Sequence, residues 1–264
     1  MQINHEFLKV EGLSKTYVPG AAPVFENVNF DIAQGEFVCI IGHSGCGKTT
    51  ILNVLAGLEE ATSGYAYMLG REIKGPSLER GVVFQGHALM PWMTVLQNIN
   101  FAVKSKFSDW PKARIEAHSE RYLELVGLTA AKHKRPAELS GGMKQRVGIA
   151  RAFAIEPKML LLDEPFGALD AFTREELWCI LRDLWTEQKF NVILVTHDLR
   201  ESVFLADTVY VMSKSPGRFV VKKEIDLPRP RDLEVTYTPE FTHIVHELRG
   251  HIGAMRKTGA VTNP

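Results

Sequence analysis

The stretch GHSGCGKT at residues 42–49 constrains the fold of this chain more than any other. It matches the phosphate-loop pattern G-x-x-x-x-G-K-[ST], which functions only between a strand and a helix. Both neighbours are present. The apolar run FVCII at 37–41 is typical of a strand covered on both faces, and the helical pattern after Lys48 ends near Gly57. The sequence therefore predicts an α/β core built around this loop.

The residue types of the loop suit a nucleotide. Its glycines let the backbone wrap phosphates without clashes from Cβ atoms, and N–H groups at the start of a helix attract anions. Lys48 can reach the β- and γ-phosphates, and the hydroxyl of Thr49 can bind Mg²⁺. We expect these residues to bind the nucleotide: Gly42, His43, Ser44, Gly45, Cys46, Gly47, Lys48, Thr49 and Thr50. The loop alone also fits a kinase or a GTPase, although the sequence has no N-K-x-D guanine-reading motif.

Two acids end a second apolar strand, MLLLDE at 159–164. Ligand sites in open α/β sheets lie at the carboxyl ends of the strands, so Asp163 is expected to hold Mg²⁺ through water, beside Thr49. Glu164 is the candidate general base for an attacking water, a role that contributes about 10²–10⁴ in rate.

Two further polar residues follow apolar runs. His197 ends the run VILVTH, where it can contact the γ-phosphate, although a lone histidine at a strand end is usually structural. Gln85 follows VVF and can bind Mg²⁺ or position the water. From spacing alone, a surface glutamine that opens a loop is an alternative interpretation of Gln85.

The stretch ELSGGMKQR at 138–146 places two glycines in the first turn of a predicted helix, a cost of roughly 1 kcal/mol each against alanine. Ser140 and the N–H groups of Gly141 and Gly142 would form a second anion site at a helix N-terminus. A single nucleotide does not need both this turn and the phosphate loop. We therefore expect two chains to face each other head to tail, each offering this turn to the nucleotide held by the other.

The composition limits the classes of function. Lysine plus arginine and aspartate plus glutamate number 31 each, so the formal net charge is zero, which argues against a free-standing nucleic-acid-binding protein. The three cysteines form no C-x-x-C pair, which favours a reduced cytosolic setting over a disulfide framework. The first residues lack a signal-peptide pattern and no run of 18 apolar residues occurs, so we expect any membrane role to come through a partner.

The rest of the chain alternates between strand and helix patterns. Residues 28–32 alternate as in a half-buried strand, and the segment from about 87 to 155 is predicted to be helical, with Ile115, Tyr122 and Val126 on one stripe. Further predicted elements are a helix over 170–187, a buried strand before His197, a hairpin around the SPGR turn and a tail helix over 238–256.

The ordered set GHSGCGKTT, Gln85, LSGGMKQ, LLLDEP, GALD and His197 resembles the nucleotide-binding subunit of an ABC transporter over roughly residues 5–225. The resemblance implies a P-loop NTPase fold with a RecA-like α/β core, an N-terminal antiparallel β subdomain and an inserted helical subdomain at about 87–155. The chain would be a single ABC ATPase domain over 1–264, with a tail from about 228. ATP and Mg²⁺ would be its cofactors.

The resemblance also implies a role for each matching residue. Tyr17 would stack on adenine, and Gln85 would sense the γ-phosphate and link to the helical subdomain. Asp163 would lie on the Mg²⁺ side, with Glu164 as the catalytic base. Asp170 would reach across the dimer, and His197 would be the switch histidine. The turn at Ser140, Gly141 and Gly142 would act in trans.

Finer patterns resemble bacterial importers, and within them the nitrate, sulfonate, taurine and bicarbonate group; the phosphate-loop region and the segment 73–92 look closest to the nitrate branch. Such a subunit would be a homodimer or would pair with a second ATPase. It would lie at the cytoplasmic face of the inner membrane, bound to permease subunits and served indirectly by a solute-binding protein, without nucleic acid. A soluble ABC ATPase acting on nucleic acid or ribosomes is the alternative of another class. A small-molecule kinase would leave LSGGMKQ unexplained.

The segment LMPWMTV at 89–95 is unusually apolar for a loop. One interpretation is core packing within the helical subdomain. The other is a groove that receives a short helix from a membrane subunit, because exposed apolar patches mark interfaces.

Overall fold

The computed structural model describes residues 6–86, 88–167 and 169–259, with side chains as far as residue 254. The chain divides into two compact units: unit 1 comprises Met1–Ser77 and Asn191–Pro264, and unit 2 comprises Leu78–Phe190. No helix among the described residues is long and apolar enough to cross a membrane.

Unit 1 contains an antiparallel sheet in the order β2-β1-β4-β5. Its strands are β1 (Glu6–Lys15), β2 (Phe25–Ala33), β4 (Ser63–Met68) and β5 (Arg71–Glu72). The predicted alternation in β2 is confirmed, because Val28, Phe30 and Ile32 are buried and the two residues between them are exposed. The period of two places one face of this strand in the core.

Parallel strands carry the phosphate loop of unit 1. They are β3 (Phe37–Gly42), β8 (Asn191–Thr196) and β9 (Thr208–Met212), and β10 (Phe219–Glu224) pairs with β9 as the predicted hairpin. β3 lies between β8 and β9 and runs parallel to both. Every residue of β3 and β8 is buried, as expected for strands covered on both faces.

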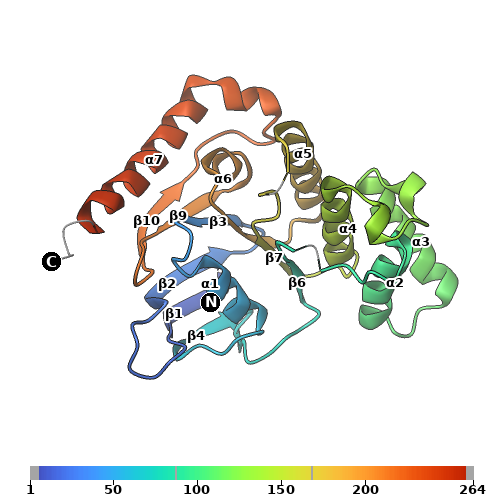
Figure 1. Ribbon diagram of the computed structural model, residues 1–264, viewed down its shortest axis with the longest axis horizontal. Coiled ribbons are helices and arrows are strands. Elements are labelled where there is room, and N and C mark those ends of the chain that lie inside the picture. Colours follow the sequence, from blue (N-terminus) through green and yellow to red (C-terminus); the bar gives the residue numbers. More distant parts are fainter. Residues whose placement is uncertain (1–5, 87, 168, 260–264) are drawn as a thin grey trace, which may run out of the picture. The chain divides into compact units, whose positions relative to one another are not determined.

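Helices cover both faces of these strands (Figure 1). α1 (Lys48–Ala56) packs on one face of β3 and β8, and α6 (Leu199–Leu205) packs on the other. α7 (Pro239–Gly259), with the short helix η3 (Leu233–Tyr237) before it, lies against α6 and β9. Both the helix after the phosphate loop and the tail helix were predicted, and both are confirmed.

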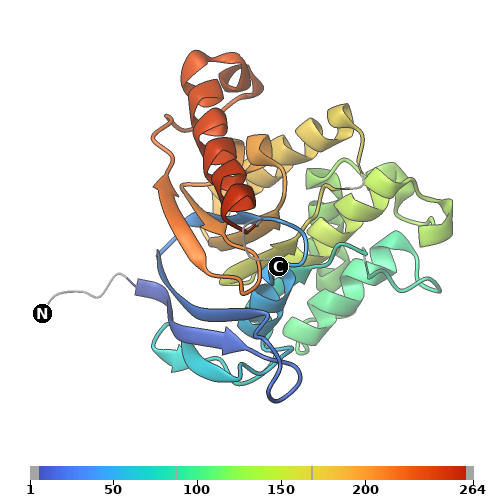
Figure 2. The same cartoon turned by 60° about the vertical axis from the view of Figure 1, so that its left-hand side comes forward.

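Unit 2 combines a parallel strand pair with a group of helices (Figure 2). Its elements are β6 (Arg80–Val83), α2 (Val95–Lys106), α3 (Lys112–Leu125), the short helices η1 (Thr129–Ala131) and η2 (Pro136–Glu138), α4 (Gly141–Phe153), β7 (Met159–Asp163) and α5 (Ala171–Gln188). α2, α3 and α4 pack on one another, and α4 also contacts β6 and α5. The predicted stripe is confirmed, because Ile115, Tyr122 and Val126 are all buried.

Candidate active site

The phosphate loop leads from the end of β3 into α1, as the sequence predicts. Lys48 is 5% exposed, and its ammonium donates to the carbonyls of Gly42 at 2.9 Å and His43 at 3.1 Å. The amide of Cys46 donates to the carbonyl of His43 at 3.3 Å, which closes a tight turn inside the loop. The lysine therefore lies in the hollow of the loop, where its charge is held by backbone oxygens.

The positions of the loop require glycine for different physical reasons. Gly45 and Gly47 have positive φ angles of +78° and +99°, which side chains rarely adopt. A Cβ at Gly42 would meet the carbonyl oxygen of Met212 at 2.8 Å. The loop also depends on a glycine outside it, because a Cβ at Gly217 would lie 2.1 Å from the carbonyl oxygen of Cys46. The β9–β10 hairpin thus supports the phosphate loop from outside.

His197 emerges beside the phosphate loop at one sheet edge of unit 1. Ile41 and Thr196 are register partners in the parallel pair β3–β8, so Gly42, the last residue of β3, and His197, the first residue after β8, lie at the same carboxyl end of the strands. His197 is exposed, and the following Asp198 caps α6 by accepting from the amides of Arg200 and Glu201.

The candidate acids of unit 2 also lie at a sheet edge. Val83 and Leu162 are partners in the parallel pair β6–β7, so Asp163, which ends β7, and Gln85 and Glu164, which follow the two strands, lie at the same carboxyl end. The amide nitrogen Nε2 of Gln85 donates to Oε2 of Glu164 at 3.4 Å. Glu164 has a φ of +44°, a sparsely populated conformation for a residue with a side chain. Asp163 is 7% exposed, whereas Gln85 is exposed and Glu164 is half-buried.

The predicted second anion turn is the N-terminus of α4. Ser140 caps the helix by accepting from the amide of Met143 at 3.3 Å. No described atom lies within 4 Å of the Cβ that an alanine would place at Gly141, so this position is open to a ligand. Asp170, further along the chain, caps α5 by accepting from the amide of Thr173 at 3.0 Å, and backbone and side-chain hydrogen bonds from Thr173 lower the pKa of its carboxyl.

Tyr17 lies just beyond β1 and is 58% exposed. Its hydroxyl donates to Oε2 of Glu59 at 2.9 Å, and the ammonium of Lys15 lies 5.1 Å from its ring centroid. An exposed aromatic ring with one end tethered is suited to stack on a planar base.

Sequence reasoning missed residues whose partners are distant in the chain or whose role is to hold a loop. Asn98 is 1% exposed and bonds four backbone groups of the loop before α2: the amide and carbonyl of Met90 and the carbonyls of Met93 and Thr94. Arg151 donates to the carbonyl of Ala88 at 2.7 Å. An asparagine among apolar residues in a predicted helix was the only available signal.

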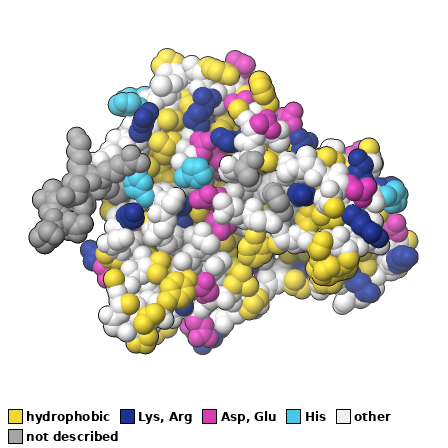
Figure 3. Space-filling model, in the orientation of Figure 1, with side chains coloured by type: hydrophobic (Ala, Val, Ile, Leu, Met, Phe, Trp, Pro, Cys, Tyr) yellow, Lys and Arg dark blue, Asp and Glu magenta, His cyan; other side chains and the backbone are white. Residues whose placement is uncertain are grey.

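An apolar groove of about 670 Å³ lies in unit 2, beside this loop. Trp92, which is 70% exposed, lines it together with Met93, Phe101, Trp110 and Ile115, and Lys104 and Lys112 also line it. Figure 3 shows hydrophobic side chains gathered over α2. The exposed part of LMPWMTV is thus a surface feature, while Val95 belongs to the core.

The residues predicted to hold Mg²⁺ fit a hard cation. Thr49, Asp163 and Gln85 offer oxygen donors, which Mg²⁺ prefers over nitrogen or sulfur. Among the described residues, no group of three His, Cys, Asp or Glu side chains could hold a metal by itself.

Comparison with known proteins identifies the family. The profile of the ABC transporter family matches residues 25–167. The chain is 45% identical to the nitrate import ATP-binding protein NrtD of Synechococcus elongatus, with 92% of this chain and 90% of that protein covered. It is 46% identical to the bicarbonate transport ATP-binding protein CmpD of Synechocystis sp. (86% and 81% covered), and 49% identical to the aliphatic sulfonates import ATP-binding protein SsuB of Bacillus licheniformis (79% and 80%).

Solved structures agree with this assignment. The dimeric post-hydrolysis state of the ATP-binding cassette MJ0796, bound to ADP and Pi, matches with a TM-score of 0.76 and 30% identity over 84% of this chain and all of that one. The cassette cbiO1 from Clostridium perfringens matches with a TM-score of 0.76 and 27% identity over 96% of this chain and 100% of that one. The predicted P-loop NTPase fold is confirmed. This chain belongs to the ABC transporter family, and within it is the ATP-binding subunit that hydrolyses ATP.

Proposed function

We propose that this ATPase works as a head-to-tail dimer that energises the import of a small oxyanion, most specifically nitrate. The main observation in support of the proposed dimer is the open N-terminus of α4. The chain has a complete phosphate loop of its own, yet Gly141 leaves a second phosphate-binding turn uncovered among the described residues. The solved cassette bound to ADP and Pi, which is dimeric, supports the same arrangement.

In this proposal, the predicted site residues have the following roles. Tyr17 stacks on adenine, residues Gly42 to Thr50 wrap the phosphates, and Lys48 leaves its two carbonyl partners to pair with the β- and γ-phosphates. Glu164 accepts a proton from the attacking water, and Gln85, which donates to this carboxylate, keeps it oriented. His197 contacts the γ-phosphate. Ser140, Gly141 and Gly142 of one chain close over the nucleotide of the other, and Asp170 crosses the interface.

Mg²⁺ fits the oxygen donors of Thr49, Gln85 and Asp163, directly or through water. When bound, it would neutralise the charge that develops on the phosphate oxygens. Asp163 suits this role because its carboxylate stands at the carboxyl end of β7, directly before the candidate base Glu164.

The proposed solute rests on resemblance. The relatives named for nitrate, bicarbonate and sulfonate transport are 45%, 46% and 49% identical to this chain, so the choice of nitrate rests on the phosphate-loop region and the segment 73–92, which resemble the nitrate branch. Aliphatic sulfonate or taurine and bicarbonate are the alternatives for the same role. Uptake of labelled nitrate, bicarbonate and taurine in cells with and without the gene separates them, and loss of nitrate uptake alone is the expected result.

The partner proposed for the groove of Trp92 is a short helix of an integral membrane permease. The groove is apolar with two lysines at its edge, which suits an amphipathic helix that carries acidic residues. The subunit would then lie at the cytoplasmic face of the membrane, and a solute-binding protein would act on the permease from the other side. A soluble role on nucleic acid finds no support in the zero net charge.

A Glu164→Gln variant tests the dimer and the catalytic base together. It keeps the shape of the side chain and can still hydrogen-bond with Gln85, but it cannot take a proton. We expect ATP hydrolysis to fall by about 10²–10⁴ while ATP still binds. Size-exclusion chromatography with light scattering should then show a dimer with ATP and a monomer with ADP. A variant that stays monomeric at saturating ATP would contradict the proposed dimer.

A further inference from the structure

The ring of Tyr17 is held in place although most of it is exposed. Its hydroxyl donates to Glu59 at 2.9 Å and also hydrogen-bonds with Thr50, the last residue of the phosphate loop segment. The ammonium of Lys15 lies over one face of the ring, 5.1 Å from its centroid. The opposite face is therefore the one that a planar base could use.

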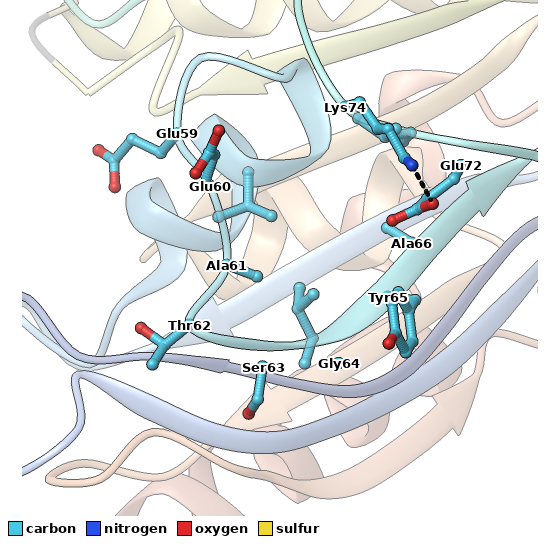
Figure 4. Close-up of a pocket in the computed structure, with 13 residues that line it drawn as sticks. Glu59, Glu60, Ala61, Thr62, Ser63, Gly64, Tyr65, Ala66, Glu72 and Lys74 are labelled. Carbon is cyan, nitrogen blue, oxygen red and sulfur yellow. Dashed lines mark ion pairs between the residues drawn. The ribbon is translucent and has the colours of Figure 1, made fainter.

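Glu59 is itself fixed from two sides. Its Oε1 accepts from the side-chain amide of Asn53 on α1 at 3.2 Å, and its Oε2 lies 3.9 Å from the ammonium of Lys15. Glu59 lines a hollow of about 550 Å³ in unit 1, together with Glu60, Thr62 and residues of β4 and β5. Figure 4 shows its carboxylate turned away from Ser63, Tyr65 and Glu72. The carboxylate thus serves Tyr17 and α1 rather than this hollow.

The backbone around Tyr17 is also hydrogen-bonded to the loop at 57–62, which joins α1 to β4 and contains Glu59. The amide of Thr16 donates to the hydroxyl of Thr62 at 2.9 Å, and the amide of Thr62 donates to the carbonyl of Ser14 at 2.9 Å. The ammonium of Lys15 donates to the carbonyl of Glu60 at 2.6 Å. Because this loop directly follows α1, the aromatic ring and the phosphate loop are connected through one short, bonded segment.

We infer that Glu59 is a positioning residue for the nucleotide: it holds the ring of Tyr17 at a set place relative to the phosphate loop before ATP arrives. The inference rests on the proposed stacking of Tyr17 on adenine. An exposed tyrosine without this tether would lose side-chain freedom when the base binds, and a side chain ordered in advance avoids that cost. Glu59 lies outside the phosphate loop and bonds Tyr17, Asn53 and Lys15, so we expect its effect to be on binding rather than on the chemical step.

The experiment compares ATP with a ligand that has no base. Binding of ATP and of inorganic tripolyphosphate is measured by calorimetry on the purified chain, for Glu59→Ala, Glu59→Gln, Tyr17→Phe, Tyr17→Ala and the wild type. Glu60→Ala is the matched control, because Glu60 is the adjacent exposed carboxylate and the backbone carbonyl that Lys15 bonds remains. Thermal unfolding of each variant checks that the fold is intact.

We expect Glu59→Ala to weaken ATP binding about three- to tenfold and to leave tripolyphosphate binding unchanged. The maximal rate at saturating ATP should stay the same while KM rises. Glu59→Gln, which keeps an acceptor, should bind ATP like the wild type, as should Glu60→Ala. Tyr17→Phe should match Glu59→Ala, and the double variant Tyr17→Phe with Glu59→Ala should be no weaker than either single one.

Different results would overturn different claims. If Tyr17→Ala binds ATP normally, the stacking role in the proposed function is wrong. If Tyr17→Ala weakens ATP binding but Glu59→Ala does not, the inference about Glu59 is wrong and the stacking role stands. A loss of tripolyphosphate affinity in Glu59→Ala equal to the loss for ATP would show a general structural effect and would also overturn the inference.

Discussion

An alanine Cβ at Gly142 would lie 2.7 Å from Cγ2 of Thr173, the residue whose amide binds the capping carboxylate of Asp170. The two glycines of the α4 turn therefore differ. Gly141 faces open space among the described residues, whereas Gly142 is required by the close approach of α5. The turn proposed to reach the partner's nucleotide and the residue proposed to cross the interface are thus packed against each other within unit 2.

This contact predicts that a second substitution, at Thr173, restores what Gly142→Ala loses. Gly142→Ala should lower ATPase activity, since the new methyl group displaces Thr173 and the α5 N-terminus; overpacking of this kind costs about 1–3 kcal/mol. Thr173→Ser removes the methyl group but keeps the hydroxyl that bonds Asp170. The double variant should therefore recover most of the activity and of the unfolding free energy, measured by phosphate release and urea denaturation.

Gly141→Ala is the matched control for stability. It should unfold like the wild type, because its methyl group meets no described atom, but it should hydrolyse ATP poorly if the turn approaches a partner's phosphate. No recovery in the Gly142→Ala, Thr173→Ser double variant would mean that Gly142 also serves the anion directly.

Local patterns predicted much of this molecule. The alternation over 28–32, the apolar run before Gly42 and the helix that ends at Gly57 are short-range signals, and each element is where the sequence placed it. The candidate residues at strand ends followed from the same patterns. The pairs His197 with Gly42 and Gln85 with Glu164 each lie at one edge of their unit because parallel strands bring their carboxyl ends together.

Contacts between distant parts of the chain could not be predicted in this way. In the sequence, Gly217 looks like any other turn glycine. That this position requires glycine is evident only from the close approach of the Cys46 carbonyl. The role of Asn98 depends on where the loop at 90–94 folds back. For Gly142 the sequence suggested only the anion, since the packing of Thr173 against it arises from tertiary structure.

Arg231 provides a prediction about the tail. It is 2% exposed and donates to the carbonyls that end α6 and follow β10: Val203, Phe204, Ala206, Ile225 and Leu227. Burial, together with the charge of Arg229, lowers its pKa to about 10, so it remains protonated at neutral pH. Arg231→Ala would leave buried carbonyls without their donor, and we expect the unfolding free energy to fall by about 3 kcal/mol or more.

Urea denaturation measures this effect as a lower midpoint. Arg249→Ala is the control, since Arg249 is exposed on α7 and its loss should change stability by no more than about 0.5 kcal/mol. A tail that merely lies on the surface would give Arg231→Ala and Arg249→Ala the same midpoint, and would refute the anchoring role of Arg231.

Trp92 tests the proposed permease groove. Asn98 holds the loop that carries it, so Trp92 is a fixed and 70% exposed surface feature whose replacement should not disturb the core. Trp92→Asp should keep ATP binding and basal hydrolysis, while solute uptake in cells falls at least about tenfold, as expected for a buried aromatic anchor of an interface. Tyr237→Asp changes an equally exposed aromatic residue, 72% exposed, and should leave uptake intact. Normal uptake in the Trp92→Asp variant would exclude this groove as the coupling surface.

The thiol of Cys46 gives a prediction about pH. Burial raises its pKa above the ordinary 9.0, although the nearby charge of Lys48 opposes the shift. Only the thiolate reacts with iodoacetamide, so a raised pKa means slow alkylation at pH 7.5 and a rate that climbs about tenfold for each pH unit below the pKa. Cys179, which is partly exposed, should be modified first, and Cys39, fully buried with its pKa raised still further, should be modified last. Peptide mapping after timed alkylation at pH 7.0, 8.0 and 9.0 measures the order of modification, because each step changes the thiolate fraction about tenfold. A Cys46 that reacts faster than Cys179 at pH 7.0 would mean that the phosphate loop opens readily and activates this thiol, and would contradict a buried thiol with a raised pKa.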